Sequence, residues 1–253
     1  MKQRSLAAAL LVAAGMAVPV VTAAATGAQA DAALCGQYDS TQVQGRYVVM
    51  NNRWGGNAEQ CVDVTGSGFR LTSQKGSKPT DGAPLSYPAI YGGCHYDNCS
   101  PGTNLPVRIG DVASASTSIG YGYNASGIYN ASYDIWMDPS PKRTGVNQVE
   151  LMIWLNRQGP IQPIGSRVGS TTIAGRTWEV WQGNNGGNDV VSYLAPSPIS
   201  NFSFDVLDFV RDVDNRTQVS TSWYLTSVQA GFEPWQGGEG LSVNNFSLDV
   251  RTR

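Results

Sequence analysis

The chain has 253 residues, a formal charge of −2 and one histidine, and its charged share of 14% is well below the usual value of about 25%. Because Lys and Arg do not outnumber Asp and Glu, we expect no nucleic-acid partner. An apolar share of 41% excludes a disordered chain, and the length suits one large β-rich domain.

The N-terminal segment has the features of a secretory signal peptide. Two basic residues precede an apolar run from Leu6 to Val21, and small residues then lead to Ala28-Gln29-Ala30. A glycine and a proline interrupt the run and no positive cluster follows it, which disfavours the alternative of a membrane anchor. We therefore predict that residues 1–30 are removed on export, and that residues 31–253 form one secreted, extracellular domain with no membrane contact.

The four cysteines, Cys35, Cys61, Cys94 and Cys99, all follow this segment. In an oxidising space they predict two disulfides, and three pairings are possible. Proximity in sequence favours Cys35–Cys61 and Cys94–Cys99 without deciding between the three. A rival metal site at Cys94, His95 and Cys99 lacks a fourth ligand, so we expect no metal. His95 is then interpreted as a loop residue lining a cleft.

The remaining pattern is that of an all-β domain. Short runs of β-branched and aromatic residues recur between turn clusters such as Asp81-Gly82 and Asn184-Asn185-Gly186-Gly187, which is typical of an antiparallel sandwich or barrel. One stretch predicts a helix, because apolar residues between Val206 and Val213 follow the spacing i, i+3, i+4, i+7. We expect two stacked sheets with this short helix under one edge.

Four strand-like segments each place polar and aromatic side chains on one face. In Val149–Leu155, alternation separates an apolar core face from Glu150, Met152 and Trp154. The segments Arg46–Trp54, Ser132–Asp138 and Trp223–Trp235 give the corresponding faces Met50, Asn52 and Trp54; Ser132, Asp134, Trp136 and Asp138; and Ser227, Gln229, Gly231, Glu233 and Trp235. A solvated strand face would explain one such segment, but four indicate a concave surface for a sugar chain. Indoles stack on pyranose rings there, while carboxylates and amides bind hydroxyls.

Only five glutamates could supply the carboxyl pair that glycosidic cleavage needs. Glu59 and Glu239 lie in polar turns, and Glu179 in a strand-like segment is a fallback candidate. Glu150 and Glu233 remain, each in a strand and close to a tryptophan. The sequence has no G-x-S-x-G, phosphate-loop or H-E-x-x-H motif, and we expect no cofactor.

These segments resemble glycoside hydrolase family 12. Glu150–Leu155 followed by Gly159–Gly165 resembles the nucleophile segment of that family, and Gln229–Trp235 with Asn244–Ser247 resembles its acid/base segment. Supporting matches are Asn51-Asn52-Arg53-Trp54, Cys94-His95-Tyr96, Tyr133-Asp134-Ile135-Trp136 and Trp178-Glu179-Val180-Trp181. The resemblance covers residues 31–253 in order and is greatest to secreted endoglucanases of actinobacteria.

The resemblance implies a β-jelly-roll of two curved antiparallel sheets with one short helix, and a retaining endo-β-1,4-glucanase that acts on β-1,4-glucan as a monomer. Glu150 would be the nucleophile, Glu233 the general acid/base, and Asp134 a partner hydrogen-bonded to the nucleophile. Retention predicts that the two catalytic carboxyl groups lie about 5–5.5 Å apart. The family also carries two disulfides in the arrangement that proximity favours.

The same resemblance implies the sugar contacts. Asn52, Trp54 and Tyr96 would bind the non-reducing side of the substrate, and Trp235 with the Gly159–Gly165 loop, including Pro160, would border the reducing side. The other residues that we predict to bind substrate are His95, Trp136, Met152 and Asn156.

Two other functions are compatible with parts of this pattern. A xyloglucan-specific hydrolase could use the same fold, with a cleft that admits branched chains. A non-catalytic carbohydrate-binding sandwich would explain the aromatics but would not need two glutamates on one face. A structural cell-surface protein is a weaker alternative. Hydrolysis of a panel of glucans separates them.

Overall fold

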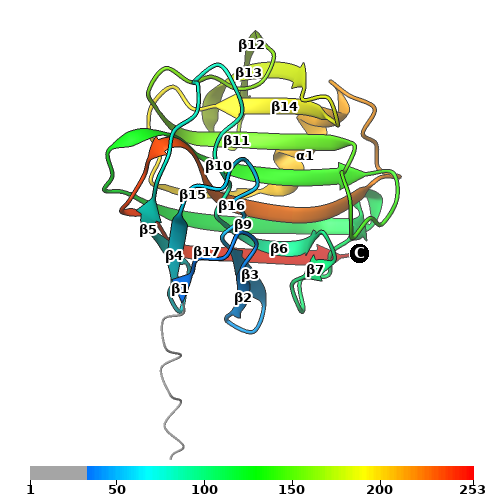
Figure 1. Ribbon diagram of the computed structural model, residues 1–253. Helices are drawn as coiled ribbons and strands as arrows, with labels where there is room; N and C mark the ends of the chain where they lie inside the picture. Colours follow the sequence, from blue (N-terminus) through cyan, green and yellow to red (C-terminus); the bar gives the residue numbers. More distant parts are fainter. Residues whose placement is uncertain (1–32) are drawn as a thin grey trace, which may run out of the picture. The chain divides into compact units, whose positions relative to one another are not determined.

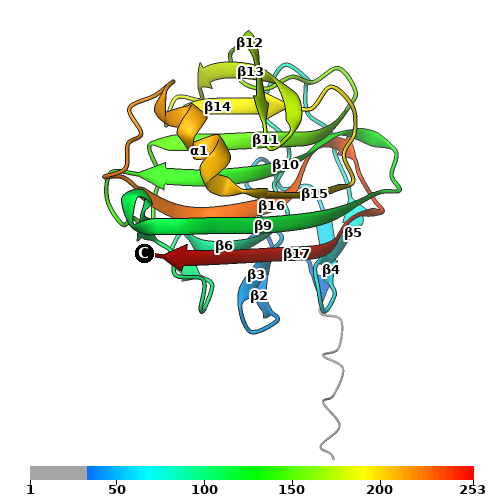
Figure 2. The same ribbon diagram turned by 180° about the vertical axis from the view of Figure 1, so that it is seen from behind.

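The computed structural model describes residues 33–253, and the predicted signal peptide lies outside this part. The described residues form two β-sheets and one α-helix, with a 3-10 turn η1 (Ile109–Asp111) between β8 and β9 (Figures 1 and 2). Within residues 33–253, no helix has the length and apolarity that a membrane span requires.

The smaller sheet has six antiparallel strands. Their spatial order is β1 (Ala33–Leu34), β4 (Gln60–Val64), β5 (Phe69–Gln74), β17 (Leu241–Thr252), β9 (Val112–Tyr123) and β15 (Asn201–Asp205). In the view of Figure 2 the long strands β9 and β17 lie across the front of the molecule.

The larger sheet carries the polar face that the sequence predicts. Its main order is β12 (Ser166–Ile173), β13 (Arg176–Asn184), β14 (Asp189–Leu194), β11 (Val149–Gln158), β10 (Gly127–Asp138), β16 (Tyr224–Gly237), β6 (Ala89–His95), β3 (Tyr47–Met50) and β2 (Ser40–Val43). Short strands β7 (Asn98–Cys99) and β8 (Val107–Arg108) pair with β6 and β16.

One pair in this sheet departs from the expected antiparallel arrangement, because β11 and β14 run parallel. After β11 the chain forms the hairpin β12–β13 at the sheet edge and returns as β14 beside β11. Parallel neighbours begin at the same edge of a sheet. The loop that leads into β14 therefore lies beside the start of β11, where Glu150 pairs with Val190.

The hydrophobic core lies between the sheets and follows the predicted alternation. Tyr133 and Ile135 of β10 and Leu151 of β11 are fully buried in it. Phe232 of β16 reaches across to the smaller sheet, where its ring lies 5.0 Å from that of Tyr121 in an edge-to-face contact. The predicted all-β jelly-roll sandwich is confirmed.

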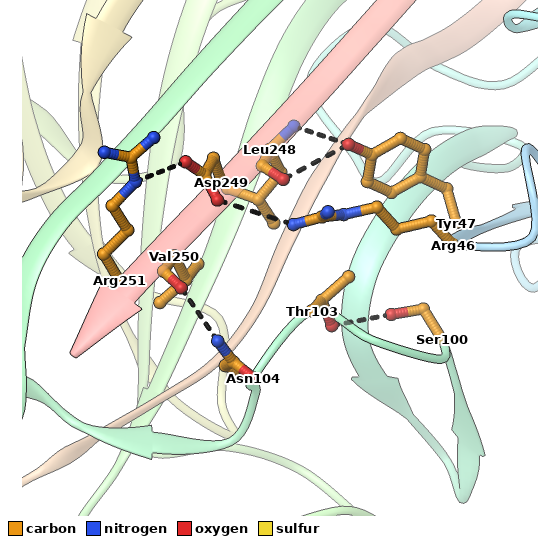
Figure 3. Close-up of polar contacts among 9 residues, drawn as sticks. All are labelled: Arg46, Tyr47, Ser100, Thr103, Asn104, Leu248, Asp249, Val250 and Arg251. Atoms are coloured by element: carbon orange, nitrogen blue, oxygen red, sulfur yellow. Dashed lines mark hydrogen bonds and ion pairs between the residues drawn. The ribbon is translucent and has the colours of Figure 1, made fainter.

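Polar contacts also join the two sheets near β17 (Figure 3). The Tyr47 hydroxyl accepts a hydrogen bond from the Leu248 amide at 2.9 Å and donates to the Leu248 carbonyl at 3.2 Å. Asn104 donates to the Val250 carbonyl at 3.0 Å. These bonds hold the loop before β8 and the hairpin β2–β3 against β17.

The predicted helix is α1 (Val206–Asp214). Asp205 caps its N-terminus by accepting a hydrogen bond from the Leu207 amide at 2.9 Å. On its buried side, the Phe209 ring lies 5.5 Å from that of Trp178 in β13 and 5.0 Å from that of Tyr193 in β14. The helix thus covers the core face of the larger sheet next to β15, as expected (Figure 2).

One predicted strand is shorter than the alternation indicates. β3 ends at Met50, because the next residues leave the extended conformation and Asn52 has a φ of +40°. The Asn51 side chain is buried and donates to the carbonyls of Gly36 and Gln60, so it holds the chain in this turn. The other three segments form parts of β10, β11 and β16.

The disulfides are Cys35–Cys61 and Cys94–Cys99, the pairing that proximity favours. The second joins β6 to β7 and closes the hairpin that carries His95 and Tyr96. Both cysteines of the rival metal site are therefore in a disulfide.

Candidate active site

A cleft with a volume of about 1510 Å³ crosses the outer face of the larger sheet. Side chains of β3, β6, β16, β10, β11 and β14 form its floor. Loop residues 80–84, 143–147, 160–165 and 185–188 contribute to its walls. It brings together segments that are far apart in the sequence.

The two selected glutamates lie on the strands that flank β10. Glu150 on β11 pairs with Trp136, and Glu233 on β16 pairs with Asn130. Asp134 lies between these two positions on the same face of β10, since side chains alternate along a strand. All three carboxyl groups line the cleft.

Glu150 is almost buried, with 8% of its surface exposed. Its Oε2 accepts hydrogen bonds from the side-chain amides of Asn188 at 3.1 Å and Asn185 at 3.4 Å. Burial raises the pKa of Glu150 to about 7, although the hydrogen bond from Asn188 opposes that rise. The amides favour the ionised form that a nucleophile needs.

Glu233 is partly exposed and has a different partner. Asn130 donates its side-chain amide to Oε2 of Glu233 at 2.5 Å and accepts from the Glu233 backbone amide at 3.2 Å. Burial raises the pKa of Glu233 to about 8; the Asn130 hydrogen bond opposes this rise and the charge of Glu150 adds to it. Glu233 therefore holds its proton to higher pH than an ordinary glutamate, as a general acid must.

Asp134 is influenced by the charges of both glutamates. It is 4% exposed, and its pKa is raised well above the ordinary range by burial and then by the charges of Glu150 and Glu233. Its carboxylate accepts a hydrogen bond from the Ser132 hydroxyl at 3.2 Å. The hydrogen bonds to Glu150 within residues 33–253 come from the amides described above and not from Asp134, which lies opposite Met152 in the register.

Exposed aromatic side chains line the cleft near the disulfide hairpin. Trp54 is 46% exposed and Tyr96 is 60% exposed, and both line the cleft together with Asn52 and the exposed Tyr38. Of the six large apolar side chains that are exposed within residues 33–253, five line the cleft. An apolar surface concentrated in this way marks a binding groove.

His95 also lines the cleft, as predicted. Its ring lies 4.9 Å from that of Tyr96, and its Nδ1 is 3.4 Å from the side-chain amide of Gln229. Burial lowers the pKa of His95 to about 4, so the ring is neutral at neutral pH. A neutral imidazole can exchange hydrogen bonds with a sugar hydroxyl.

Trp235, which we predict to border the reducing side, belongs to an apolar cluster in the cleft floor. Met152, Trp154 and Trp235 pack together, and Trp235 donates its indole N–H to the Gly82 carbonyl at 2.8 Å. Trp136 and Pro160 also line the cleft. Asn156 does not, because an irregularity in the pairing of β10 with β11 places it opposite the core residue Ala131.

The three rejected glutamates lie outside the cleft. Glu59 accepts from the Ser73 hydroxyl, Glu239 pairs with Lys75, and the fallback candidate Glu179 faces Arg167 at 3.6 Å.

Three polar residues of the site escaped the sequence analysis. Asn130 lies on the Asp134 face of β10, so extending the predicted alternation two residues before Ser132 would have identified it. Asn185 and Asn188 lie in a segment for which the sequence predicts only a turn between two strands. Their contact with Glu150 depends on the parallel pairing of β11 with β14.

Comparison with known proteins agrees with this geometry. Residues 45–251 match the family model described as Glycosyl hydrolase family 12. The chain is 53% identical over 149 residues to the "Probable cellulase Cel12b" of Mycobacterium tuberculosis, covering 59% of this chain and 99% of that protein. It is 31% identical over 225 residues to the xyloglucan-specific endo-beta-1,4-glucanase A of Emericella nidulans, covering 85% of this chain and 90% of that one.

Solved structures give the same answer. The native structure of the cellulase endo-1,4-beta-glucanase CelB2 is 60% identical to this chain, with a TM-score of 0.87 over 88% of this chain and all of the other. The endoglucanase Cel12A of Rhodothermus marinus is 36% identical, with a TM-score of 0.83 over the same shares. The chain belongs to glycosyl hydrolase family 12.

Proposed function

We propose that this chain is an endo-β-1,4-glucanase that cleaves internal bonds of β-1,4-glucans with retention of configuration. The observation that carries the proposal is the pair Glu150 and Glu233. Both line an open cleft on strands that flank β10, each has its own amide partner, and burial raises the pKa of both above the ordinary glutamate value. An open cleft suits attack within a long chain.

The mechanism assigns one role to each glutamate. Protonated Glu233 gives its proton to the glycosidic oxygen as the bond to the anomeric carbon breaks, and a carboxylate oxygen of Glu150 bonds to that carbon. Glu233, now ionised, then takes a proton from a water whose oxygen attacks the same carbon and displaces Glu150. Both carboxyl groups return to their starting states, and two inversions give retention.

In this proposal Asp134 influences the protonation of Glu150 and Glu233. Its charge, when present, raises the pKa of neighbouring carboxyl groups, and its own pKa is held high by burial and by Glu150 and Glu233. A protonated Asp134 can donate to a nearby carboxylate. We therefore propose that Asp134 is a partner of the nucleophile whose own covalent bonds stay unchanged during the reaction.

The subsites follow from the cleft lining. We propose that Trp54 and Tyr96 stack on sugar rings of the non-reducing side and that Asn52 binds their hydroxyls, because the two aromatic side chains are exposed within the cleft. Trp235 and Pro160 border the reducing side. His95, Trp136 and Met152 complete the lining.

Linear β-1,4-glucan is the preferred substrate in this proposal. One relative named as a probable cellulase and one named as an endo-1,4-beta-glucanase share 53% and 60% identity with this chain, whereas the xyloglucan-specific relative of Emericella nidulans shares 31%. Product formation from carboxymethylcellulose, mixed-linkage glucan and xyloglucan tests this. A rate on xyloglucan above those on both linear glucans would favour the xyloglucanase alternative.

The processing of the chain is part of the proposal. We expect export with loss of residues 1–30, an extracellular enzyme of one domain (residues 31–253), and a monomer. The signal-peptide pattern and two disulfides support export. N-terminal sequencing of the secreted protein and light scattering check these expectations.

The catalytic assignment is tested with Glu150→Gln and Glu233→Gln, and Glu179→Gln serves as a matched control outside the cleft. Hydrolysis of mixed-linkage glucan should be lost in the first two variants and unchanged in the control. Proton NMR of the first products should show the β-anomer. Near wild-type turnover in Glu150→Gln, or α-anomer formed first, would contradict the mechanism.

A further inference from the structure

The loop between β13 and β14 holds an amide pair against the proposed nucleophile. Asn188 and Asn185 both donate to the same oxygen, Oε2 of Glu150, at 3.1 and 3.4 Å. Within residues 33–253, the other oxygen, Oε1, accepts no hydrogen bond from the protein. One oxygen is thus fixed while the other remains available to bond to an anomeric carbon.

Hydrogen bonds within the loop determine the orientation of the Asn185 amide. Its Oδ1 accepts from the backbone amides of Gly187 at 2.9 Å and Asn188 at 3.0 Å. Because the oxygen is bound to these donors, the NH₂ group must point away from them, toward Glu150. Gly186 has a φ of +91°, which allows the chain to turn between the two asparagines.

The position of Asn188 follows from the strand pairing. Glu150 pairs with Val190 in the parallel ladder, and the Asp189 backbone amide donates to the Gln148 carbonyl at 3.1 Å. Asn188 is 5% exposed, so its amide is a buried donor whose partner is a charge. A hydrogen bond of this kind contributes more than one between neutral groups.

We propose that Asn188, assisted by Asn185, is a positioning residue that orients Glu150 for attack and favours its ionised form. This inference rests on the proposed function and deepens it. The residues touch the nucleophile and not the reacting carbon, so their effect should appear in the bond-forming step and in the ionisation of Glu150.

The test compares Asn188→Ala and Asn185→Ala with the control Asn184→Ala. The Asn184 amide belongs to the same turn but donates to Asp189 at 2.8 Å and does not line the cleft. The probe is an aryl β-cellobioside with a good leaving group, whose departure needs no proton from Glu233. The value of kcat/KM for this probe therefore reports the attack of Glu150.

We expect kcat/KM of Asn188→Ala for this probe to fall about 10- to 100-fold. Loss of the donor raises the pKa of Glu150, so the acidic limb of the kcat/KM profile should move to higher pH. Asn185→Ala should shift the same limb by less, because its bond is longer. A carbon-13 NMR titration of Glu150 gives the same pKa without relying on turnover.

An unmoved acidic limb in Asn188→Ala would overturn the inference, even if activity fell, because a structural role alone reduces rate without changing the ionisation of Glu150. A loss matched by Asn184→Ala would overturn it too. Failure of the wild-type enzyme to hydrolyse both the probe and β-1,4-glucan would instead reject the proposed function. If Asn188→Ala folds poorly, the shift of the acidic limb in the kcat/KM profile of Asn185→Ala decides the outcome.

Discussion

The two faces of β10, β11 and β16 are made by the same strands and have opposite chemistry. On the core face, side chains such as Tyr133, Ile135 and Phe232 are fully buried among apolar groups. On the cleft face, the carboxyl groups of Asp134, Glu150 and Glu233 have raised pKa values because they too have lost much of their water.

The difference indicates that the core face stabilises the sandwich, whereas burial of the carboxyl groups on the cleft face lowers its stability. Burying apolar surface contributes roughly 25 cal/mol per Å². Burying carboxyl groups close to one another opposes folding once they ionise. Neighbours in sequence can therefore have opposite effects on stability and activity, and Phe232 and Glu233 are one such pair.

The largest expected effect is on the cleft face. Glu233→Gln removes the proposed general acid, so hydrolysis of β-1,4-glucan should fall about 10²- to 10⁴-fold. An aryl cellobioside with a good leaving group should form the glycosyl-enzyme at a rate much less affected, because its departure needs no proton. Equal losses in glycosyl-enzyme formation on both substrates, measured by stopped flow, would show that Glu233 is not the acid.

Phe232→Ala tests the core face one residue away. The ring is fully buried and packs edge-to-face with Tyr121 and Phe69, so the free energy of unfolding should fall by about 3–5 kcal/mol. Urea unfolding measures this loss. The fraction that remains folded should keep its kcat, and a specific loss of kcat would mean that the two faces are not independent.

The same glutamate should limit stability. The pKa of Glu233 is raised by burial to about 8 in the folded chain and is about 4.3 when unfolded, so its contribution to stability is present below the lower value and is lost as pH rises through the higher one. Glu233→Gln should therefore be more stable than wild type by about 0.5–2 kcal/mol at alkaline pH. The difference should disappear near pH 4, and denaturation at both pH values checks the sign.

Activity should depend on pH through the same two groups. The nucleophile must be ionised and the acid protonated, so kcat/KM should fall below the pKa of Glu150 and above that of Glu233, about 7 and 8 in the free enzyme. A profile whose acidic limb lies at the ordinary glutamate value of about 4.3 would contradict the effect of burial. The limbs belong to a coupled pair and are fitted together.

The smallest effect is expected at the rim of the cleft. Trp54→Ala removes an exposed indole, and we expect KM for glucan to rise about 2- to 10-fold, the equivalent of about 0.5–1.5 kcal/mol. The control is Val168→Ala, which removes a similarly exposed apolar side chain outside the cleft. Equal KM values in the two variants would remove Trp54 from the subsites.

Much of this arrangement could be predicted from local pattern. Alternation in β11 assigned Leu151 and Glu150 to opposite faces, because successive side chains must point to opposite sides of a strand. The helical spacing predicted α1, since an apolar stripe needs a core to cover it. Because the chain has only five glutamates, there are few candidates for the proposed catalytic pair.

The predictions that did not match the structure involve pairing between distant strands. Asn156 has the parity of Glu150, but an irregularity in the β10–β11 pairing takes it out of the cleft. The strand predicted to reach Trp54 ends at Met50, where bonds from Asn51 to distant carbonyls turn the chain. Neither the irregularity in the β10–β11 pairing nor the set of bonds from Asn51 can be recognised from the residues next to it in the sequence.

The sequence by itself determined the all-β class, the helix, most face assignments in the long strands and the choice of the two candidate glutamates, because these depend on residue type and short-range periodicity. The tertiary structure decided which neighbours those glutamates have. Asn130 on β10 and the amides of the β13–β14 loop reach the carboxylates only through strand order and register. Those contacts, formed across long sequence separations, oppose the rise that burial causes in the pKa values of Glu150 and Glu233.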